Sequence, residues 1–175
     1  MKELERILTS ENIEEEIRNN EEYIFSLIPE LRSEVGFDQK HPHHSFDVWN
    51  HTIEALKHIE PDLELRLIVL LHDIGKPFSY QDGSDGVRHF KGHPSKSKEI
   101  SKSILKRLNI EPKDEILYII ENHDTPIDTN NINDRELEIK RLKIQYADAY
   151  AHSPSTIQKR ILKLNAIKEL IWFII

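Results

Sequence analysis

Apolar residues recur every three or four positions along most of the 175-residue chain, which is the spacing of helices with one buried face. Only five residues are glycine, so the chain contains few of the strongest helix breakers. We therefore expect an all-α fold, arranged as a compact helical bundle. The pattern predicts two acidic helices within residues 1–35 and further helices at 46–60, 62–74, 94–108, 112–122, 134–152 and 154–175.

The length fits a single domain with a hydrophobic core. Within residues 1–175 we expect three parts: packing helices at 1–35, a central core at 36–152, and a C-terminal helix at 153–175. The last helix carries an apolar stripe that needs a groove or a partner helix. We expect this stripe and the apolar end of the chain to dock within the chain or in a homodimer formed through this helix.

Two apolar helices end in the same unusual way, with histidine and aspartate followed by proline. The run that ends at His72 and Asp73 continues into Gly75-Lys76-Pro77, and the later run ends at His123-Asp124 just before Thr125-Pro126. Burying such groups is costly unless they are paired or bound to a metal. Taken alone, the first stretch fits a metal site and a buried His–Asp pair equally well.

Other helices place metal-binding residue types on inner faces or at ends. His51 lies among the inner residues of 46–60, His93 follows Gly92 at a helix start, and Asp148 sits on an apolar stripe. Together these positions predict one metal centre in the core of the bundle, because carboxylates on apolar faces are rare without partners. The predicted metal-binding residues are His51, His72, Asp73, His93, His123 and Asp148.

The chain contains no cysteine, so any metal must be held by histidine and carboxylate side chains. Such ligands suit manganese, iron, cobalt, nickel or zinc better than magnesium. One ion would be held by His51, His72, Asp73 and Asp148. His93 and His123 would hold a second ion, with Asp73 as the bridge between the two.

The segment at 75–94 contains the turn signals Asp82-Gly83 and Asp85-Gly86 and predicts a flexible lid. We expect Lys76 and Asp73 to be catalytic, with Lys76 neutralising charge on a phosphoryl oxygen. On the lid, the predicted substrate-binding residues are His89, Arg88 and Lys91. For Arg88 and Lys91, ordinary solvated charge is the alternative interpretation.

The formal net charge of −7 disfavours sequence-independent binding to long nucleic acid, which needs a basic surface. The charged N-terminus lacks the apolar core of a signal peptide, and no apolar run is long enough to span a bilayer. We therefore expect a cytoplasmic protein with no membrane partner.

The series His51, His72-Asp73 and Asp148 resembles the HD-domain superfamily of metal-dependent phosphohydrolases, and His93 and His123 resemble the added ligands of its dinuclear members. The segments at 41–52, 89–93 and 147–154 are similar to the HD domain of bacterial CCA-adding tRNA nucleotidyltransferases. The resemblance covers about residues 36–165. It implies phosphatase or phosphodiesterase activity on a nucleotide or related ester through a metal-activated hydroxide.

Two departures refine this expectation. Nothing in the sequence resembles the nucleotidyltransferase head, so we expect a free-standing HD domain that does not add CCA. There is also no Gly-Tyr-Pro motif like that of the cyclic-di-GMP phosphodiesterases.

Two alternatives fit the same residues. Some HD-fold proteins, such as myo-inositol oxygenase, use a di-iron centre with the same ligand order, and iron content with oxygen uptake would identify such an oxygenase. A non-catalytic module that senses phosphate or a nucleotide would bind ligand without turnover.

Overall fold

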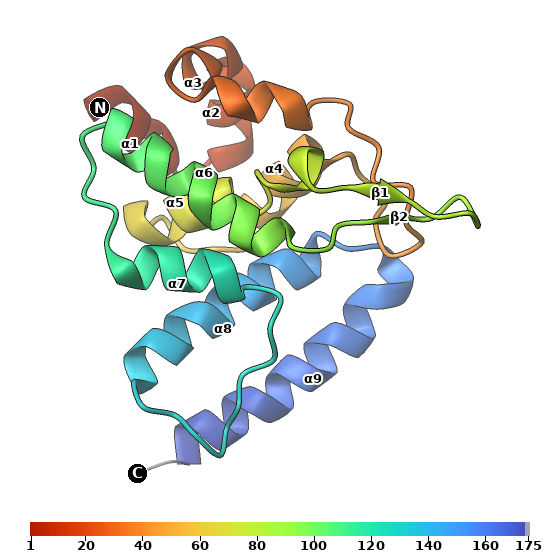
Figure 1. Cartoon of the computed structure of the whole chain (residues 1–175). Coiled ribbons are helices and arrows are strands. Elements are labelled where there is room, and N and C mark those ends of the chain that lie inside the picture. The colour runs from red at the N-terminus through yellow and green to blue at the C-terminus, as the bar shows by residue number, and fades with distance from the viewer. Residues whose placement is uncertain (174–175) are drawn as a thin grey trace.

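The computed structural model describes the backbone of residues 1–173 and the side chains of residues 1–171. Helices dominate this part of the chain, which confirms the all-α prediction (Figure 1). The α-helices are α1 (Lys2–Leu8), α2 (Ile13–Asn19), α3 (Glu21–Leu27), α4 (Val48–Leu56), α5 (Leu63–Leu71), α6 (His93–Arg107), α7 (Asp114–Asn122), α8 (Arg135–Tyr150) and α9 (Pro154–Phe173). The expectation of two helices before residue 36 is wrong, because α1, α2, α3 and the 3₁₀ helix η1 (Pro29–Glu34) all precede it.

The segment predicted to be an irregular lid contains a short 3₁₀ helix and a small hairpin. The helix η2 (Lys76–Phe78) is followed by strands β1 (Gln81–Asp82) and β2 (Arg88–His89), which pair antiparallel with Gln81 opposite His89. Figure 1 shows this hairpin projecting to one side of the bundle. It is too small to alter the fold class.

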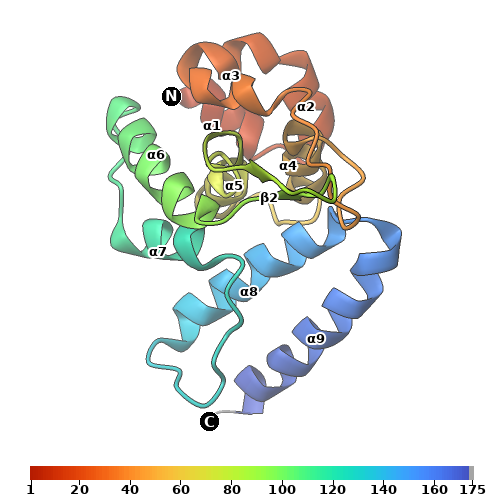
Figure 2. The same cartoon turned by 45° about the vertical axis from the view of Figure 1, so that its right-hand side comes forward.

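Helix α5 lies in the middle of the molecule, between the N-terminal helices and the pair α8–α9 (Figure 2). Seven of its nine residues are buried, as expected for a helix enclosed by neighbours. The N-terminal helices α1–α3, together with α4 to α8, contribute to the main apolar core around α5. A second apolar cluster joins α8 to α9 through residues such as Leu142, Leu164 and Ile171.

Aspartate side chains fix the starts of three helices that matter for the site. Asp47, Asp62 and Asp134 each accept a hydrogen bond from the backbone N–H three residues later, which satisfies a donor that the helix leaves unpaired. These caps set the registers of α4, α5 and α8. The same helices carry or deliver His51, His72 and Asp148.

The chain turns sharply after α5 and packs against the start of α6. A Cβ atom at Gly75 would lie 2.5 Å from the carbonyl oxygen of His93 and 2.6 Å from the backbone nitrogen of Ser97. The Gly75 N–H also donates to Ser97 Oγ at 2.9 Å. Gly92 then begins α6 with φ of 78°, which favours glycine. The first turn of α6 therefore packs closely against the turn that holds His72 and Asp73.

Helix α9 docks along α8 through part of the stripe predicted from the sequence (Figures 1 and 2). The predicted docking of the apolar end falls partly on residues 172–175, whose side chains lie outside the described part of the structure. A homodimer through α9 stays a prediction. Among residues 1–173, no helix has the length and apolar character needed to cross a bilayer.

Replacing Gly75 by alanine should lower the free energy of unfolding by about 1–3 kcal/mol, because the new methyl group meets backbone atoms that cannot move independently. Urea unfolding followed by circular dichroism measures the change. Gly86→Ala is the comparison. An added Cβ atom there meets no other atom within 4 Å, so the only strain comes from the positive φ. Equal stability of Gly75→Ala and the unmodified chain would contradict the close packing described above.

Candidate metal centre

The structure brings all six predicted metal-binding side chains to one place in the core. They come from α4, the end of α5, the start of α6, the end of α7, and α8, and each is at most 6% exposed. They form two groups that share Asp73: one contains His51, His72, Asp73 and Asp148, and the other contains Asp73, His93 and His123. That these residues hold metal stays a prediction. The distances and hydrogen bonds around them indicate whether the site fits an ion.

In the first group, the candidate ligand atoms are spaced as metal ligands are. His51 Nε2 lies 2.9 Å from Asp148 Oδ1 and 3.4 Å from Asp73 Oδ2. His72 Nε2 lies 3.3 Å from Asp73 Oδ2. Atoms bound at about 2.1 Å to one ion lie roughly 3.0–3.4 Å apart in octahedral or tetrahedral geometry. The group therefore fits one ion with little rearrangement.

The second group uses the other oxygen of the same aspartate. Asp73 Oδ1 lies 3.2 Å from His93 Nε2 and 3.6 Å from His123 Nε2, and the two imidazole nitrogens are 3.3 Å apart. Asp73 thus presents Oδ2 to one group and Oδ1 to the other. This is the arrangement of a carboxylate that bridges two ions.

Backbone carbonyls orient the four imidazole rings. The Nδ1 atom of each ring lies 2.6–3.1 Å from a carbonyl oxygen, on Ala151 for His51, Val69 for His72, Phe90 for His93 and Ile120 for His123. A carbonyl can only accept, so each Nδ1 must carry the hydrogen. In the neutral rings, each Nε2 then has a free lone pair directed toward the carboxylates, which is the tautomer needed for a metal ligand.

This tautomer leaves polar atoms that the protein does not satisfy. His72 Nε2 and Asp73 Oδ1 are buried without a hydrogen-bond partner among the described residues, and Asp73 Oδ2 has only the ion pair with Lys76. The Nε2 lone pairs of neutral His93 and His123 face each other at 3.3 Å, where no hydrogen is available to bridge them. Such orphaned groups are unfavourable in a protein interior. A cation in each group would satisfy them, so the donor set fits the metal.

The charges in the cluster are strongly coupled. Burial opposes ionisation of Asp73, but His72 and Lys76 outweigh it and hold the pKa of the carboxyl well below its usual value. Burial likewise disfavours protonated His72, yet Asp73 and Asp148 raise its pKa well above the usual value. Without metal, the carboxylates therefore draw protons onto an imidazole. A metal ion takes the place of such protons when it binds.

Lys76 lies beside the bridging carboxylate. Its Nζ atom is 2.7 Å from Asp73 Oδ2, within ion-pair distance, and donates to Gln39 Oε1 at 2.8 Å. Gln39 is itself buried and donates to the carbonyl oxygen of Phe46 at 3.1 Å. Gln39, which sequence reasoning missed, therefore positions Lys76. A glutamine in a polar loop gives no sequence signal of that role.

Helix α9 reaches the same cluster through Arg160. Its Nη2 atom donates to Asp148 Oδ2 at 2.7 Å, and its Nη1 atom donates to His152 Nε2 at 2.8 Å. His152 Nδ1 in turn donates to the carbonyl oxygen of Asp148 at 2.8 Å. Burial lowers the pKa of His152 to about 4, so this ring is neutral and fully hydrogen-bonded. Arg160 orients Asp148 by binding Oδ2, the carboxylate oxygen that His51 does not contact.

The three predicted substrate-binding residues differ in their surroundings. Arg88 is buried between the rings of Phe37 and Tyr80 and is held by Asp82 at 2.6 Å. Those bonds show that Arg88 braces the hairpin. His89 and Lys91 are exposed and, like Arg88, line a cavity of about 340 Å³ that opens onto Asp73 and Asp148.

Several histidines of the loop before α4 also reach this cavity. His43 Nδ1 lies 3.0 Å from Thr156 Oγ1 of α9, and His44 packs against the ring of His152 at a centroid distance of 4.6 Å. Burial, with the nearby charge of Lys76, lowers the pKa of His44 far below its usual value. The His44 ring is therefore neutral, and the two loop histidines line the cavity and connect the loop to α9.

Asp124 is a further residue at the cluster that the predicted set leaves out. Its Oδ2 atom lies 3.3 Å from His93 Nε2 and 3.7 Å from His123 Nε2, and the side chain is 42% exposed. The repeated His-Asp pair at the ends of α5 and α7 was the available signal. Only the structure shows that the second aspartate faces the cavity.

Comparison with known proteins gives a consistent assignment. The HD domain family matches residues 43–164 of the chain. The A-adding tRNA nucleotidyltransferase of Deinococcus radiodurans is 40% identical over 89 residues, which cover 47% of this chain and 20% of that protein. The CC-adding enzyme of Thermus thermophilus is 38% identical over 84 residues, covering 45% and 19%.

The chain thus spans about a fifth of the length of these curated relatives. No solved structure matched it. The similarity to the HD domain of tRNA nucleotidyltransferases, predicted from the sequence, is confirmed. The family match covers most of the chain and includes all six clustered side chains. The chain therefore belongs to the HD domain family.

Proposed function

We propose that this protein is a metal-dependent phosphohydrolase that acts on a nucleotide or a related small phosphate ester. One water is consumed in each turnover: its oxygen joins phosphorus, the ester P–O bond breaks, and the leaving alcohol takes a proton. The observation that supports this most directly is the bridging position of Asp73 between two groups of imidazole lone pairs.

The residues divide into two sets of ligands. His51, His72, Asp73 and Asp148 would hold one ion, and Asp73, His93 and His123 would hold a second. Divalent transition-metal ions at these positions would supply Lewis acidity and lower the pKa of a water beside the phosphorus atom. The ligand types favour manganese, iron, cobalt, nickel or zinc.

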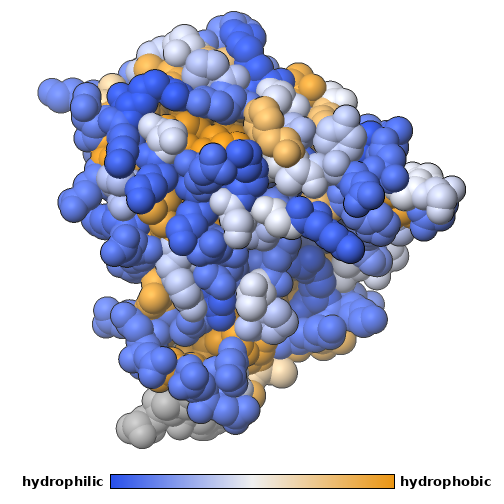
Figure 3. All heavy atoms as spheres, in the orientation of Figure 1, coloured by the Kyte–Doolittle hydropathy of each residue, from blue (hydrophilic) through white to orange (hydrophobic). Residues whose placement is uncertain are grey.

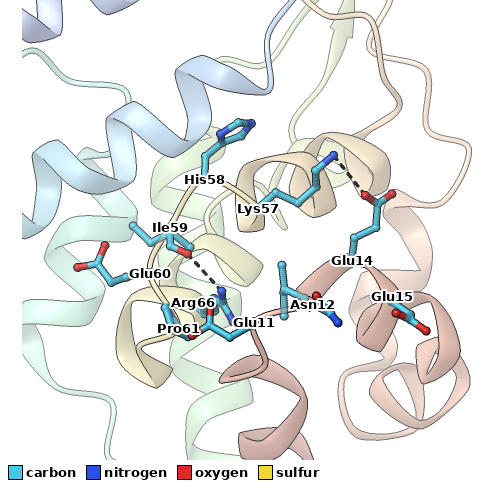
Figure 4. Close-up of a pocket in the computed structure, with 11 residues that line it drawn as sticks. Glu11, Asn12, Glu14, Glu15, Lys57, His58, Ile59, Glu60, Pro61 and Arg66 are labelled. Atoms are coloured by element: carbon cyan, nitrogen blue, oxygen red, sulfur yellow. Dashed lines mark hydrogen bonds and ion pairs between the residues drawn. The ribbon is translucent and has the colours of Figure 1, made fainter.

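The cavity that opens onto the ligands has the charge that a phosphate requires. Four cations line it beside three aspartates, two of which are proposed metal ligands, within a protein whose formal net charge is −7. The cations are Lys76, Arg88, Lys91 and Arg160. A larger hollow of about 810 Å³ elsewhere shares no residue with the metal groups (Figure 4). It is lined by four glutamates and by only two cations, Lys57 and Arg66, so its lining carries net negative charge. Its charge would repel a phosphate, so the smaller cavity is the proposed substrate site.

Lys76 has the position of an electrostatic catalyst. Its ammonium group lies in the cavity beside Asp73, is 5% exposed and is held by Gln39. A buried cation that is already oriented stabilises negative charge on phosphoryl oxygens without reorganisation. Lys91 and His89, which are exposed at the rim, would contact the outer part of the substrate.

The first test is metal analysis of the purified chain together with hydrolysis of bis-p-nitrophenyl phosphate in added manganese, cobalt or nickel. About two bound ions per chain and metal-dependent cleavage are expected. Iron with oxygen uptake and no ester cleavage would overturn the proposal in favour of an oxygenase. Nucleotide binding without turnover under any of these metals would overturn it in favour of a sensing module.

Single-site variants should separate the two metal groups. Asp73→Ala should lose both ions, because its two oxygens serve both groups, whereas His123→Ala should lose one ion and His72→Ala the other. In each variant the rate of ester cleavage should also fall by more than about 100-fold. Metal stoichiometry measured by mass spectrometry, with circular dichroism as the check of folding, tests the assignment.

His58→Ala is the matched control for these variants, since His58 is a surface histidine bonded to Glu54 and lies outside both groups. It should keep the full metal content. If Asp73→Ala or His72→Ala kept full metal content and full activity, the assignment of these residues as ligands would be wrong.

Lys76→Met should lower kcat for bis-p-nitrophenyl phosphate by about 100-fold, since it removes a positive charge directed at the reacting phosphoryl group. Its metal content should stay that of the unmodified chain. Lys102→Met, at an exposed position of α6, is the control for the change in net charge. A Lys76→Met protein with unchanged kcat would exclude Lys76 from catalysis.

A further inference from the structure

We propose that the nucleoside part of the substrate binds in a second cavity, between α8, α9 and the loop that follows α7. This inference rests on the proposed phosphohydrolase function and adds where the organic group of the ester lies. The cavity has a volume of about 260 Å³ and is lined by His123, Asp124, Pro126, Gln145, Arg160, Lys163, Leu164 and Ile167.

The second cavity adjoins the proposed phosphate site. Asp124 and Arg160 line both cavities, and His123 of the second metal group forms part of the wall. A phosphate held beside His93 and His123 would therefore direct its ester group past Asp124. Asp124 has a partly exposed carboxylate that can accept hydrogen bonds from sugar hydroxyls.

Gln145 supplies an acceptor that the protein leaves unused. Its side chain is 3% exposed, and its Nε2 atom donates to the carbonyl oxygen of Thr125 at 2.7 Å. That carbonyl can only accept, so the orientation of the amide is fixed. Among the described residues, no hydrogen bond is formed by Oε1, and Gln145 lines the cavity. An N–H group of a bound ring would satisfy this oxygen.

The remaining lining residues suit a flat, partly polar ring. Pro126, Leu164 and Ile167 offer apolar surface, and Figure 3 shows apolar side chains among polar ones in the lower half of the molecule, where α8 and α9 lie. Lys163 has no ion pair or hydrogen bond among the described residues. Its ammonium group can donate to a ring nitrogen or carbonyl.

These groups favour a nucleobase over a second phosphate. The apolar residues and the unpaired oxygen of Gln145 would disfavour phosphate oxygens, which are themselves only acceptors when ionised. A nucleobase has donors, acceptors and an apolar face, and it matches all three kinds of lining residue. Both cavities together have the size of an ordinary small-molecule site.

The test uses phosphonate isosteres, in which a methylene group replaces the 5′-oxygen so that the ligand cannot be hydrolysed. Isothermal titration of the metal-loaded full chain compares the four nucleoside 5′-phosphonates with methylphosphonate. At least one nucleoside phosphonate should bind about tenfold or more tightly than methylphosphonate. Equal affinity for all five ligands would overturn the proposal.

Lys163→Glu tests the cavity itself, because its position is exposed and the change should not disturb folding. The substitution should lower the affinity for the preferred nucleoside phosphonate by about tenfold and leave the affinity for methylphosphonate unchanged. Lys159→Glu, one helical turn earlier on α9 and outside both cavities, makes the same change in net charge and should alter neither affinity. Lys163→Glu could instead lower the affinity for inorganic pyrophosphate and leave nucleoside binding intact, while Lys159→Glu changes neither. That result would assign the cavity to a second phosphate.

The assignment of the second cavity and the proposed hydrolase function can fail independently of each other. Cleavage of bis-p-nitrophenyl phosphate by the unmodified protein tests the metal-dependent reaction without a nucleoside. If cleavage occurs but no nucleoside phosphonate depends on Lys163, the second cavity is wrongly assigned while the reaction stands. If nucleosides bind through Lys163 and no ester is cleaved, the assignment of the cavity stands and the hydrolase does not.

Discussion

The orientation of four buried imidazole rings by main-chain carbonyls is the constraint on which the site depends. Each Nδ1–H donates to a carbonyl on its own or a neighbouring helix, so each Nε2 lone pair is directed inward. For His72, His93 and His123 the carbonyl lies three residues earlier, at the end of a helix or the turn before it. The helical backbone therefore fixes both the tautomer and the direction of the ligand. This explains why His72, His93 and His123 occur at helix termini.

The second requirement is negative charge in the centre. Asp73 and Asp148 are buried among the imidazoles, and each forms an ion pair with one cation, Lys76 for Asp73 and Arg160 for Asp148. Removing either carboxylate would leave the positive groups buried without compensation, which is strongly unfavourable. The ligands and their cationic neighbours consequently form one electrostatic unit. Gln39 extends that unit to the loop before α4, and His152 extends it to the start of α9.

Much of this arrangement could be predicted from the sequence, since periodic apolar residues locate helices and polar residues on apolar faces indicate a site. His51 and Asp148 were found in this way, and His72 and His123 by the repeated His-Asp ends. The N-terminal region was less predictable, because three seven-residue helices leave too little periodicity to separate them. Gln39 and Arg160 could not be identified, because their roles depend on contacts between segments far apart in the chain. The repeated His-Asp pair pointed to Asp124, but only the structure shows that this aspartate faces the cavity.

Those distant contacts also bear on how the molecule reaches its folded state. His51 and Asp148 meet across 97 positions of sequence, and His51 contacts the carbonyl of Ala151 across 100. Closing so long a loop is entropically unfavourable before the helices between them have packed. We therefore expect the cluster to assemble late in folding, after α5 is enclosed. An ion that binds only the finished cluster would slow unfolding of the whole chain more than it would speed its folding.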